Sequence, residues 1–485
     1  MNAVAADASA PLRRAVYAIL IAVGAAGVAG RIAAVDSVDV AAYENFLKRS
    51  GREDWQRRFP FLSANDRSRW LTVRALVERG TYSIDGLIDE PNWHSIDIVK
   101  HDGHGNAAPA ANEGHLYSSK PPLLATLIAG EYWLIYNITG YSLGDHPHLL
   151  GRIMLATINI PALLVMWILL ARHVERYGRT DFGRVFVVAA GVFGTLLTTL
   201  AVALNNHLIA AAAAMVALDA VVRIVYEDDV RLRRFLQAGL AAAFAAANEL
   251  PALSFCVLVG AALLWRFPRP TLTAFVPGAL VVAAAALGTN YAAHGTIAPA
   301  YGHRNEGNNW YDFDYMRHGT AYFSYWSKRN PGRSDVDQGE PSPAVYAFHA
   351  TIGHHGIFLL TPMWLLAFVG MAQAARRDAS LRALVAGIAL VTAVCLTFYL
   401  SRPQIDRNYG GTTSGFRWVF WFAPLWLVAM LPAADACARN RFCRALACIL
   451  LAGSVFSVVF PTWNPWTHPW AMQFYEYMDW PILSE

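Results

Sequence analysis

Long apolar segments recur along most of this chain and constrain its fold more than any other feature. After a first run over residues 15–30, they lie at 149–170, 185–204, 208–226, 235–250, 251–265, 271–291, 356–374, 383–400, 417–431 and 445–460. A helix needs about 20 apolar residues to cross a bilayer. The composition, 55% hydrophobic and 15% charged, is that of a membrane protein. We predict an all-α polytopic membrane protein with about 11 transmembrane helices, in one domain over residues 1–485.

Basic residues concentrate in alternate loops between these segments. The arginine-rich loops are 171–184, 227–234, 266–270, 375–382 and 438–444, whereas the intervening turns carry almost no Lys or Arg. The positive-inside rule places such loops in the cytoplasm, together with Arg13 and Arg14. Residues 15–30 also fit a signal peptide, but this sidedness requires an uncleaved span. We predict a multi-pass protein of a bacterial cytoplasmic (inner) membrane, with its N-terminus inside and its C-terminus outside.

One further apolar segment, residues 121–138, does not fit as a span. A crossing there would reverse the side of every later arginine loop. Glu131 lies at its centre, beside Tyr132, Trp133 and Tyr136. These residues predict a juxtamembrane helix that lies in the interface, within the first outer loop.

The predicted outer face then holds most of the chemically interesting residues. It comprises the first outer loop (32–148), the large outer loop (292–355), a Gly-rich outer loop (401–416) and the end of the chain (461–485). The 292–355 loop is too long for a simple connection, so we expect it to cover a site. A net charge of +4 gives no support for a nucleic-acid partner. The five cysteines form no CxxC pattern, which argues against a disulfide framework or a zinc site.

Asp66 is the first candidate catalytic residue. It precedes a helical pattern beside the predicted membrane surface, and we expect Asn65 or Asp66 to begin a helix that runs to Glu78. An acidic residue at this place is often only a helix cap, with Arg69 and Arg74 in surface ion pairs. A rigidly held, partly desolvated carboxylate also suits a general base. Both roles are compatible with the pattern.

Several basic residues of the outer loops are candidates for binding an anion. Lys120 precedes Pro121-Pro122, where it is either an interfacial lysine or a fixed cation. Arg417 follows the Gly-rich turn 409–416, which contains Tyr409, and Arg402 and Arg407 precede that turn. Because a guanidinium can bind two phosphate oxygens at once, we predict a phosphate site here.

Other polar residues carry weaker signals. His207 and Glu249 lie at outer span ends, where most polar residues are caps, but both could reach substrate hydroxyls. The histidines of 101–104 and 349–355 lack the helical spacing of metal ligands, so we assign no metal ligand. A divalent cation stays open as a cofactor.

Three short motifs give a family resemblance. Asp66-Arg67-Ser68-Arg69-Trp70, Thr81-Tyr82-Ser83 and Tyr117-Ser118-Ser119-Lys120-Pro121-Pro122 follow one another in the first outer loop. This order resembles the C-type (GT-C) polytopic membrane glycosyltransferases, notably the protein O-mannosyltransferase and lipid A aminoarabinose transferase group. The turn Gly415-Phe416-Arg417-Trp418 is similar to a motif of bacterial members. Two positions depart from the family: Arg67 stands where it has Glu, and Trp70 where it has Tyr.

The resemblance implies inverting transfer of a sugar from a polyprenyl-phosphate donor to an acceptor hydroxyl, outside the cytoplasm. The acceptor would be a glycan, a lipid or a protein. Asp66 would be the catalytic base, and Lys120 and Arg417 would bind the donor phosphate, with Arg402 and Arg407 nearby. Tyr117, His207, Glu249 and Tyr409 are the candidates for other substrate contacts. The protein would also be in contact with membrane lipids.

Two other functions stay open. A ligase or polymerase acting on lipid diphosphates would depend on outer arginines such as Arg402 and Arg407 more than on Asp66. A lipid-linked-sugar transporter or flippase would carry ionisable residues at the centres of its spans, and often repeated halves. The spans here have almost no central charges, and the sequence shows no internal repeat.

Overall fold

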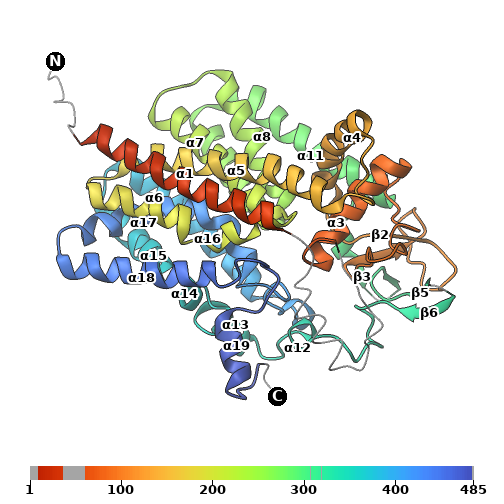
Figure 1. The fold of residues 1–485 in the computed structure, drawn as a ribbon. Helices are drawn as coiled ribbons and strands as arrows, with labels where there is room; N and C mark the ends of the chain where they lie inside the picture. The colour runs from red at the N-terminus through yellow and green to blue at the C-terminus, as the bar shows by residue number, and fades with distance from the viewer. Residues whose placement is uncertain (1–8, 36–59, 306, 318, 483–485) are drawn as a thin grey trace.

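The computed structural model describes residues 9–35, 60–305, 307–317 and 319–482, which form a helical bundle with small ribbons at one end (Figure 1). Within these residues, eight helical stretches are long and apolar enough to cross a membrane: α1 (Ala10–Ala34), α5 (Pro147–Tyr177), α6 and η2 (Asp181–Val202), α7 (Asn206–Tyr226), α10, η4 and α11 (Pro268–His294), α16 (Ala379–Leu400), η8 and α17 (Arg417–Cys437) and α18 (Arg441–Val459). The chain is an all-α polytopic membrane protein, which confirms the predicted class. The total of 11 spans stays a prediction.

The other predicted spans are shorter than a bilayer crossing needs as single helices. They correspond to α8 (Leu232–Asn248), α9 (Leu253–Arg266), and α14 (Ile357–Leu360) with α15 (Trp364–Gln373). The predicted span 356–374 is not one continuous helix, because Thr361-Pro362-Met363 interrupts it. Proline cannot donate a backbone hydrogen bond to the preceding turn. Likewise, the segment 185–204 is α-helical only to Phe193 and continues as the tighter helix η2 (Leu196–Val202).

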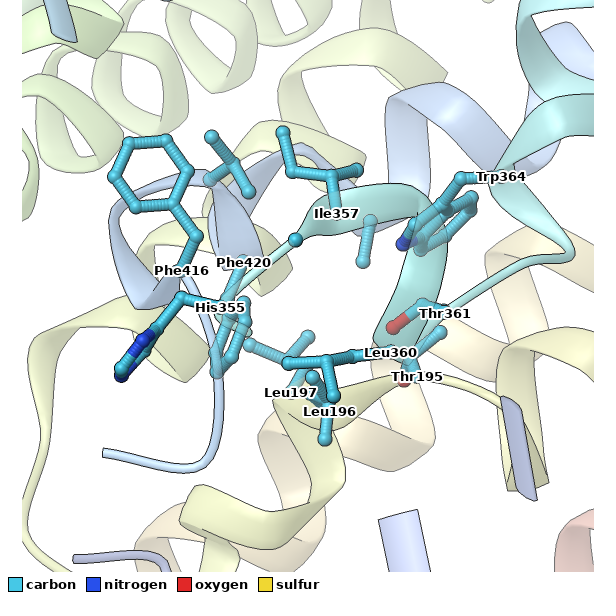
Figure 2. A pocket seen from close by; sticks show the side chains of 13 residues that line it. Thr195, Leu196, Leu197, His355, Ile357, Leu360, Thr361, Trp364, Phe416 and Phe420 are labelled. Atoms are coloured by element: carbon cyan, nitrogen blue, oxygen red, sulfur yellow. The ribbon is translucent and has the colours of Figure 1, made fainter. Parts of the chain in front are cut away.

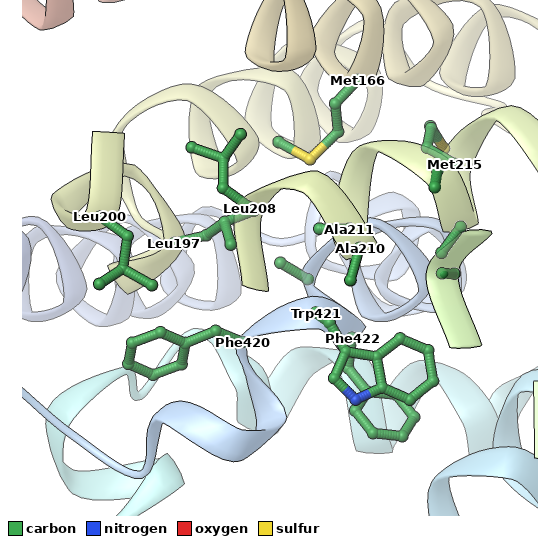
Figure 3. Close-up of a cluster of buried hydrophobic side chains, with 14 of the residues drawn as sticks. Met166, Leu197, Leu200, Leu208, Ala210, Ala211, Met215, Phe420, Trp421 and Phe422 are labelled. Carbon is green, nitrogen blue, oxygen red and sulfur yellow. The ribbon is translucent and has the colours of Figure 1, made fainter. Parts of the chain in front are cut away.

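Helix α17 lies at the centre of the bundle. Every residue from Ala423 to Asp435 is buried, and the helix packs against α5, α6, α7 and α15. Its neighbour η8 (Arg417–Phe422) contributes Trp421 and Phe422 to a cluster with Met166 of α5 and Met215 of α7 (Figure 3). Among helices surrounded by lipid, such close side-chain packing is a main source of association.

Buried ion pairs join the helices at the end that carries the arginine loops. Asp435 of α17 accepts hydrogen bonds from the backbone N–H groups of Arg179 and Thr180 and from the Thr180 hydroxyl, at 2.8–3.1 Å. It also forms an ion pair with Arg377. Gly183 must lack a side chain, because a Cβ there would lie 2.4 Å from Asp435 Oδ1.

The first outer loop contains two helices and a ribbon. Helix α3 (Ala64–Arg74) continues as the wider turn η1 (Ala75–Arg79), and α4 (Pro122–Thr139) packs against α3 and α11 (Val276–His294). Helix α4 is not among the eight candidate spans of the described residues, and its interfacial position stays a prediction. Strands β1 (Ile98–His101) and β2 (His115–Ser118) are antiparallel, with Ile98 opposite Ser118.

The large outer loop lies against the first one. It contains η5 (Ala300–Gly302), β3 (Arg304–Asn305), β4 (Asn308–Asn309), β5 (Asp314–Arg317), β6 (Thr320–Phe323), α12 (Asp335–Gln338) and α13 (Pro343–Thr351). The Lys100 backbone N–H donates to the Trp310 carbonyl at 3.0 Å, and Trp326 Nε1 donates to the Ile96 carbonyl at 3.1 Å. Short elements complete the described chain: η3 (Leu250–Ala252), η6 (Ala374–Arg376), η7 (Gln404–Asp406) and α19 (Trp470–Tyr477).

Candidate functional site

Asp66 lies in the first turn of α3, but it does not begin the helix. Ser63 is the cap: its hydroxyl accepts the Asp66 backbone N–H at 3.1 Å. The expectation that Asn65 or Asp66 begins the helix is therefore wrong. The Asp66 side chain accepts the Leu204 N–H at 3.0 Å and the Leu62 N–H at 3.5 Å. These bonds connect α3 to the segment that leads into α7.

The surroundings of Asp66 change its acidity. Its side chain is buried, with a residue exposure of 1%. Burial raises the pKa of Asp66 to about 6, although the two backbone hydrogen bonds and the nearby charges of Arg69 and Arg67 act in the opposite direction. A carboxylate with this pKa is mostly ionised at neutral pH and can still accept a proton, which is the range that suits a general base.

Lys120 pairs with Asp97, a residue that the sequence analysis did not single out. Asp97 directly precedes β1, and Lys120 follows β2 by two positions. Because Ile98 pairs with Ser118, both residues lie at the same end of the ribbon, and Lys120 Nζ lies 3.0 Å from Asp97 Oδ1. The only sequence signal for this pair was an acidic residue between two isoleucines at a strand start.

The Asp97–Lys120 pair lies mostly away from water. Burial alone would raise the pKa of Asp97, but the charge of Lys120 and its hydrogen bond, with smaller contributions from Arg417 and Arg69, lower it overall. Burial lowers the pKa of Lys120 to about 8, with Asp97 opposing this change. Asp97 is therefore a weak base, whereas Lys120 loses its charge within a physiological range of pH.

Arg69 connects this region to the start of α7 and the end of α8. Arg69 is 5% exposed, so the expectation of a surface ion pair is wrong for this residue. Arg74 does form ion pairs, with Glu78 and Glu90, but its own side chain is buried. Arg69 Nη2 donates to Asn206 Oδ1 at 2.6 Å. Asn206 Nδ2 in turn donates to Glu249 Oε1 at 2.5 Å, and the His207 ring also contacts this carboxylate.

Arg417, which lies far along the sequence, is the third basic residue near Asp97 and Lys120. Its guanidinium lies over the Trp466 ring, 5.0 Å from the centroid, and its charge acts on Asp97, Lys120 and Arg69. Arg417 is only partly exposed, and its Nε is buried without a partner. In the described part of the chain, this side chain has no ion-pair or hydrogen-bond partner. A partly buried, unpaired guanidinium is favourable only where an anion compensates it.

The Gly-rich turn explains how Arg417 reaches this place. Gly410 has φ of +99°, and a Cβ there would lie 2.7 Å from Arg417 Cγ and Nε. Glycine therefore allows both the left-handed backbone and the close packing of the arginine stem. We call Arg69, Lys120 and Arg417 the cation cluster; Asp97 and Glu249 are the carboxylates beside it.

The other predicted site residues lie in different surroundings. Tyr117 stacks on His101 with ring centroids 4.0 Å apart, in a small aromatic core between the outer loops. Tyr409 is fully buried against His355. Arg402 pairs with Asp406, and Arg407 donates to the carbonyls of residues 402, 340 and 341. Arg402 therefore holds its own loop, whereas Arg407 joins that loop to the large outer loop.

A hollow beside Phe416 is too small for a sugar. It is lined by Thr195, His355, Phe416 and Phe420, among others, and has a volume of about 20 Å³, enough for a water molecule (Figure 2). Among the described residues, no group of three or more His, Cys, Asp or Glu side chains is arranged to hold a metal ion.

The chain is similar in structure to a known enzyme. The crystal structure of the Archaeoglobus fulgidus oligosaccharyltransferase in the apo form is similar at a TM-score of 0.46 and 13% sequence identity. The similarity covers 96% of this chain and 57% of that one, so this chain spans little more than half the length of that protein. No protein-family model and no curated protein match the sequence.

Proposed function

We propose that this protein is a membrane glycosyltransferase. It transfers a sugar, with inversion, from a polyprenyl-phosphate donor to a hydroxyl of a glycan, lipid or protein acceptor on the non-cytoplasmic face. The observation that carries the proposal is the cation cluster, in which Arg417 has no paired anion among the described residues. The donor phosphate supplies that anion.

The charges of the site favour a departing phosphate. Arg69, Lys120 and Arg417 come from three separate parts of the chain and feel one another's charge. Asp97 and Glu249 offset two of these three positive charges, and an anion bound beside Arg417 would offset the third. As the bond between the anomeric carbon and the phosphate oxygen breaks, its electron pair goes to that oxygen. Preorganised cations stabilise this charge most strongly in the transition state.

Asp66 is the base of the proposal. The acceptor oxygen forms the new bond to the anomeric carbon, and its proton passes to the Asp66 carboxylate. Asp66 lies one helical turn from Arg69, so α3 carries both a base and a phosphate ligand. Asp97, whose pKa is lowered, instead keeps Lys120 charged and in place.

The test is transfer of radiolabelled sugar from a panel of polyprenyl-phosphate donors, in membranes containing wild type or a variant. Asp66→Asn should reach the membrane but lose transfer by about 10²–10⁴-fold, the usual contribution of a general base. The matched variant Asp97→Asn should retain more activity, with weaker donor use. If Asp97→Asn is inactive and Asp66→Asn is not, Asp97 is the base.

Arg417 offers a second test, which addresses the donor site. Arg417→Lys keeps the charge but loses the two-pronged geometry, so the donor concentration needed for half-maximal transfer should rise. Arg402→Ala serves as the control, because Arg402 already pairs with Asp406. Loss of transfer in Arg402→Ala or Arg407→Ala, with normal transfer in Asp66→Asn, would favour a ligase that acts on lipid diphosphates.

A further inference from the structure

A second hollow lies between the transmembrane helices. It has a volume of about 700 Å³ and lies between α5, α7, α8 and α11, which are neighbours in Figure 1. Its walls are apolar and include small side chains such as Ala162, Ala212 and Ala213 beside the larger Val165, Leu240 and Phe244. We call this hollow the α7–α8 groove.

Only one end of the groove is polar. Arg233 and Gln237 are its polar lining residues, and both belong to the first turns of α8. The neighbouring Arg231 and Arg234 pair with Asp229. Arg233 is exposed, and within the described residues no ion-pair or hydrogen-bond partner binds it. An apolar groove with one unpaired cation at its end is complementary to an amphipathic anion.

The length of the groove and the position of Arg233 indicate which kind of anion would bind there. Along α8, the lining runs from Arg233 to Phe244, which is about 16 Å at 1.5 Å per residue. This is close to half of the about 30 Å hydrocarbon core, the depth of one leaflet. Arg233 also lies in an arginine loop, on the side that the positive-inside rule assigns to the cytoplasm.

We propose that the α7–α8 groove binds an anionic glycerophospholipid of the cytoplasmic leaflet. The phosphate of its headgroup lies at Arg233, and an acyl chain fills the groove. The headgroup end at Arg233 is separate from the proposed donor site, because Arg233 lies at the start of α8, whereas Glu249, beside the cation cluster, follows its other end. The proposal therefore does not depend on the glycosyltransferase assignment.

The test measures lipid binding to the purified full-length protein in detergent, from the rise of its melting temperature during titration. The probes are phosphatidylglycerol, phosphatidylcholine and a polyprenyl phosphate. Wild type should bind phosphatidylglycerol more tightly than phosphatidylcholine. Arg233→Ala should weaken phosphatidylglycerol binding by about fivefold, the usual effect of one basic residue at a membrane surface. Arg231→Ala, a paired neighbour, should leave it unchanged.

A second variant fills the groove itself. Val165→Trp introduces a large side chain at a rim position that is 41% exposed, so the fold should tolerate it. It should abolish the stabilisation by phosphatidylglycerol. Equal phosphatidylglycerol affinity in wild type and Arg233→Ala, or no preference over phosphatidylcholine, would overturn the proposal. So would a Val165→Trp variant that loses polyprenyl phosphate and keeps phosphatidylglycerol, since the groove would then hold the donor chain.

Discussion

At the scale of single residues, two groups of the site titrate near neutral pH. Burial raises the pKa of Asp66 to about 6 and lowers the pKa of Lys120 to about 8. A base works when deprotonated, so transfer should fall as the pH drops through 6. A phosphate ligand works when charged, so transfer should also fall as the pH rises through 8.

The first prediction is a bell-shaped dependence of kcat/KM on pH, with limbs near pH 6 and pH 8, which reports the free enzyme. Lys120→Arg should remove the upper limb, because arginine stays charged throughout this range. Initial rates of sugar transfer across the pH range measure both. An upper limb that is unchanged in Lys120→Arg would show that another group causes it.

A second prediction concerns Asp97. Removing its charge takes away the main opposing effect on Lys120, so the pKa of Lys120 should fall further. In Asp97→Asn, the upper limb should therefore move to lower pH. Asp102→Asn is a suitable control, since that carboxylate is exposed and bonds within its own loop. A shift of the same size in both variants would contradict this role of Asp97.

Gly410 gives a third prediction at this scale. Gly410→Ala places a Cβ against the Arg417 side chain at a left-handed backbone position. Arg417 should be displaced, and donor use should weaken as in Arg417→Lys, while the protein still reaches the membrane. Gly302→Ala is the control, because a Cβ there meets no atom within 4 Å. Donor saturation curves distinguish the two variants.

At the scale of elements, local sequence patterns predicted where helices form better than they predicted which elements pack against each other. Apolar runs located α5, α7, α16 and α18, because lipid requires a helix to satisfy its own backbone hydrogen bonds. The pairing of Asp97 with Lys120 depends on the register of β1 and β2, which no short-range pattern fixes. The burial of Arg69 depends on α7 and α8, which lie far away in the sequence.

The contacts of Asp435, near the end of α17, lead to a prediction about stability. Asp435 joins α17 to the start of α6 and to Arg377. Asp435→Ala would leave these donors unpaired, and breaking such a buried pair usually destabilises a protein by about 3–5 kcal/mol. The melting temperature in detergent should fall clearly in Asp435→Ala and stay unchanged in Glu476→Gln, an exposed control. Equal melting temperatures would contradict the anchoring role.

At the scale of the whole molecule, the distribution of charge gives the predicted sidedness. The arginine loops lie at one end of the bundle, where pairs such as Arg13–Glu175 and Arg172–Asp219 join the helices. The outer loops and the cation cluster lie at the other end. The sequence could predict at which end each loop lies, because the orientation of a membrane helix depends on the Lys and Arg residues that flank it. It could not predict which outer cations meet, since that depends on how the loops pack.

Cys443 allows a direct test of the sidedness. It is exposed at the start of α18, in an arginine loop. A membrane-impermeant maleimide should label Cys443 only after the membrane is permeabilised, with Cys443→Ser as the blank. An Asn106→Cys variant, on the outer side, should react in intact spheroplasts. Labelling of Cys443 from outside would reverse the predicted topology.

The most direct test of the central claim is binding of a polyprenyl phosphate, the product left after transfer, to purified protein. This measurement requires neither the sugar nor the acceptor to be known. Wild type should bind, and binding should weaken by about tenfold or more in Arg417→Ala and in Lys120→Ala, because each removes a charge-assisted hydrogen bond. Arg402→Ala should bind as wild type. Equal binding by wild type, Arg417→Ala and Lys120→Ala would show that the cation cluster is not the donor phosphate site.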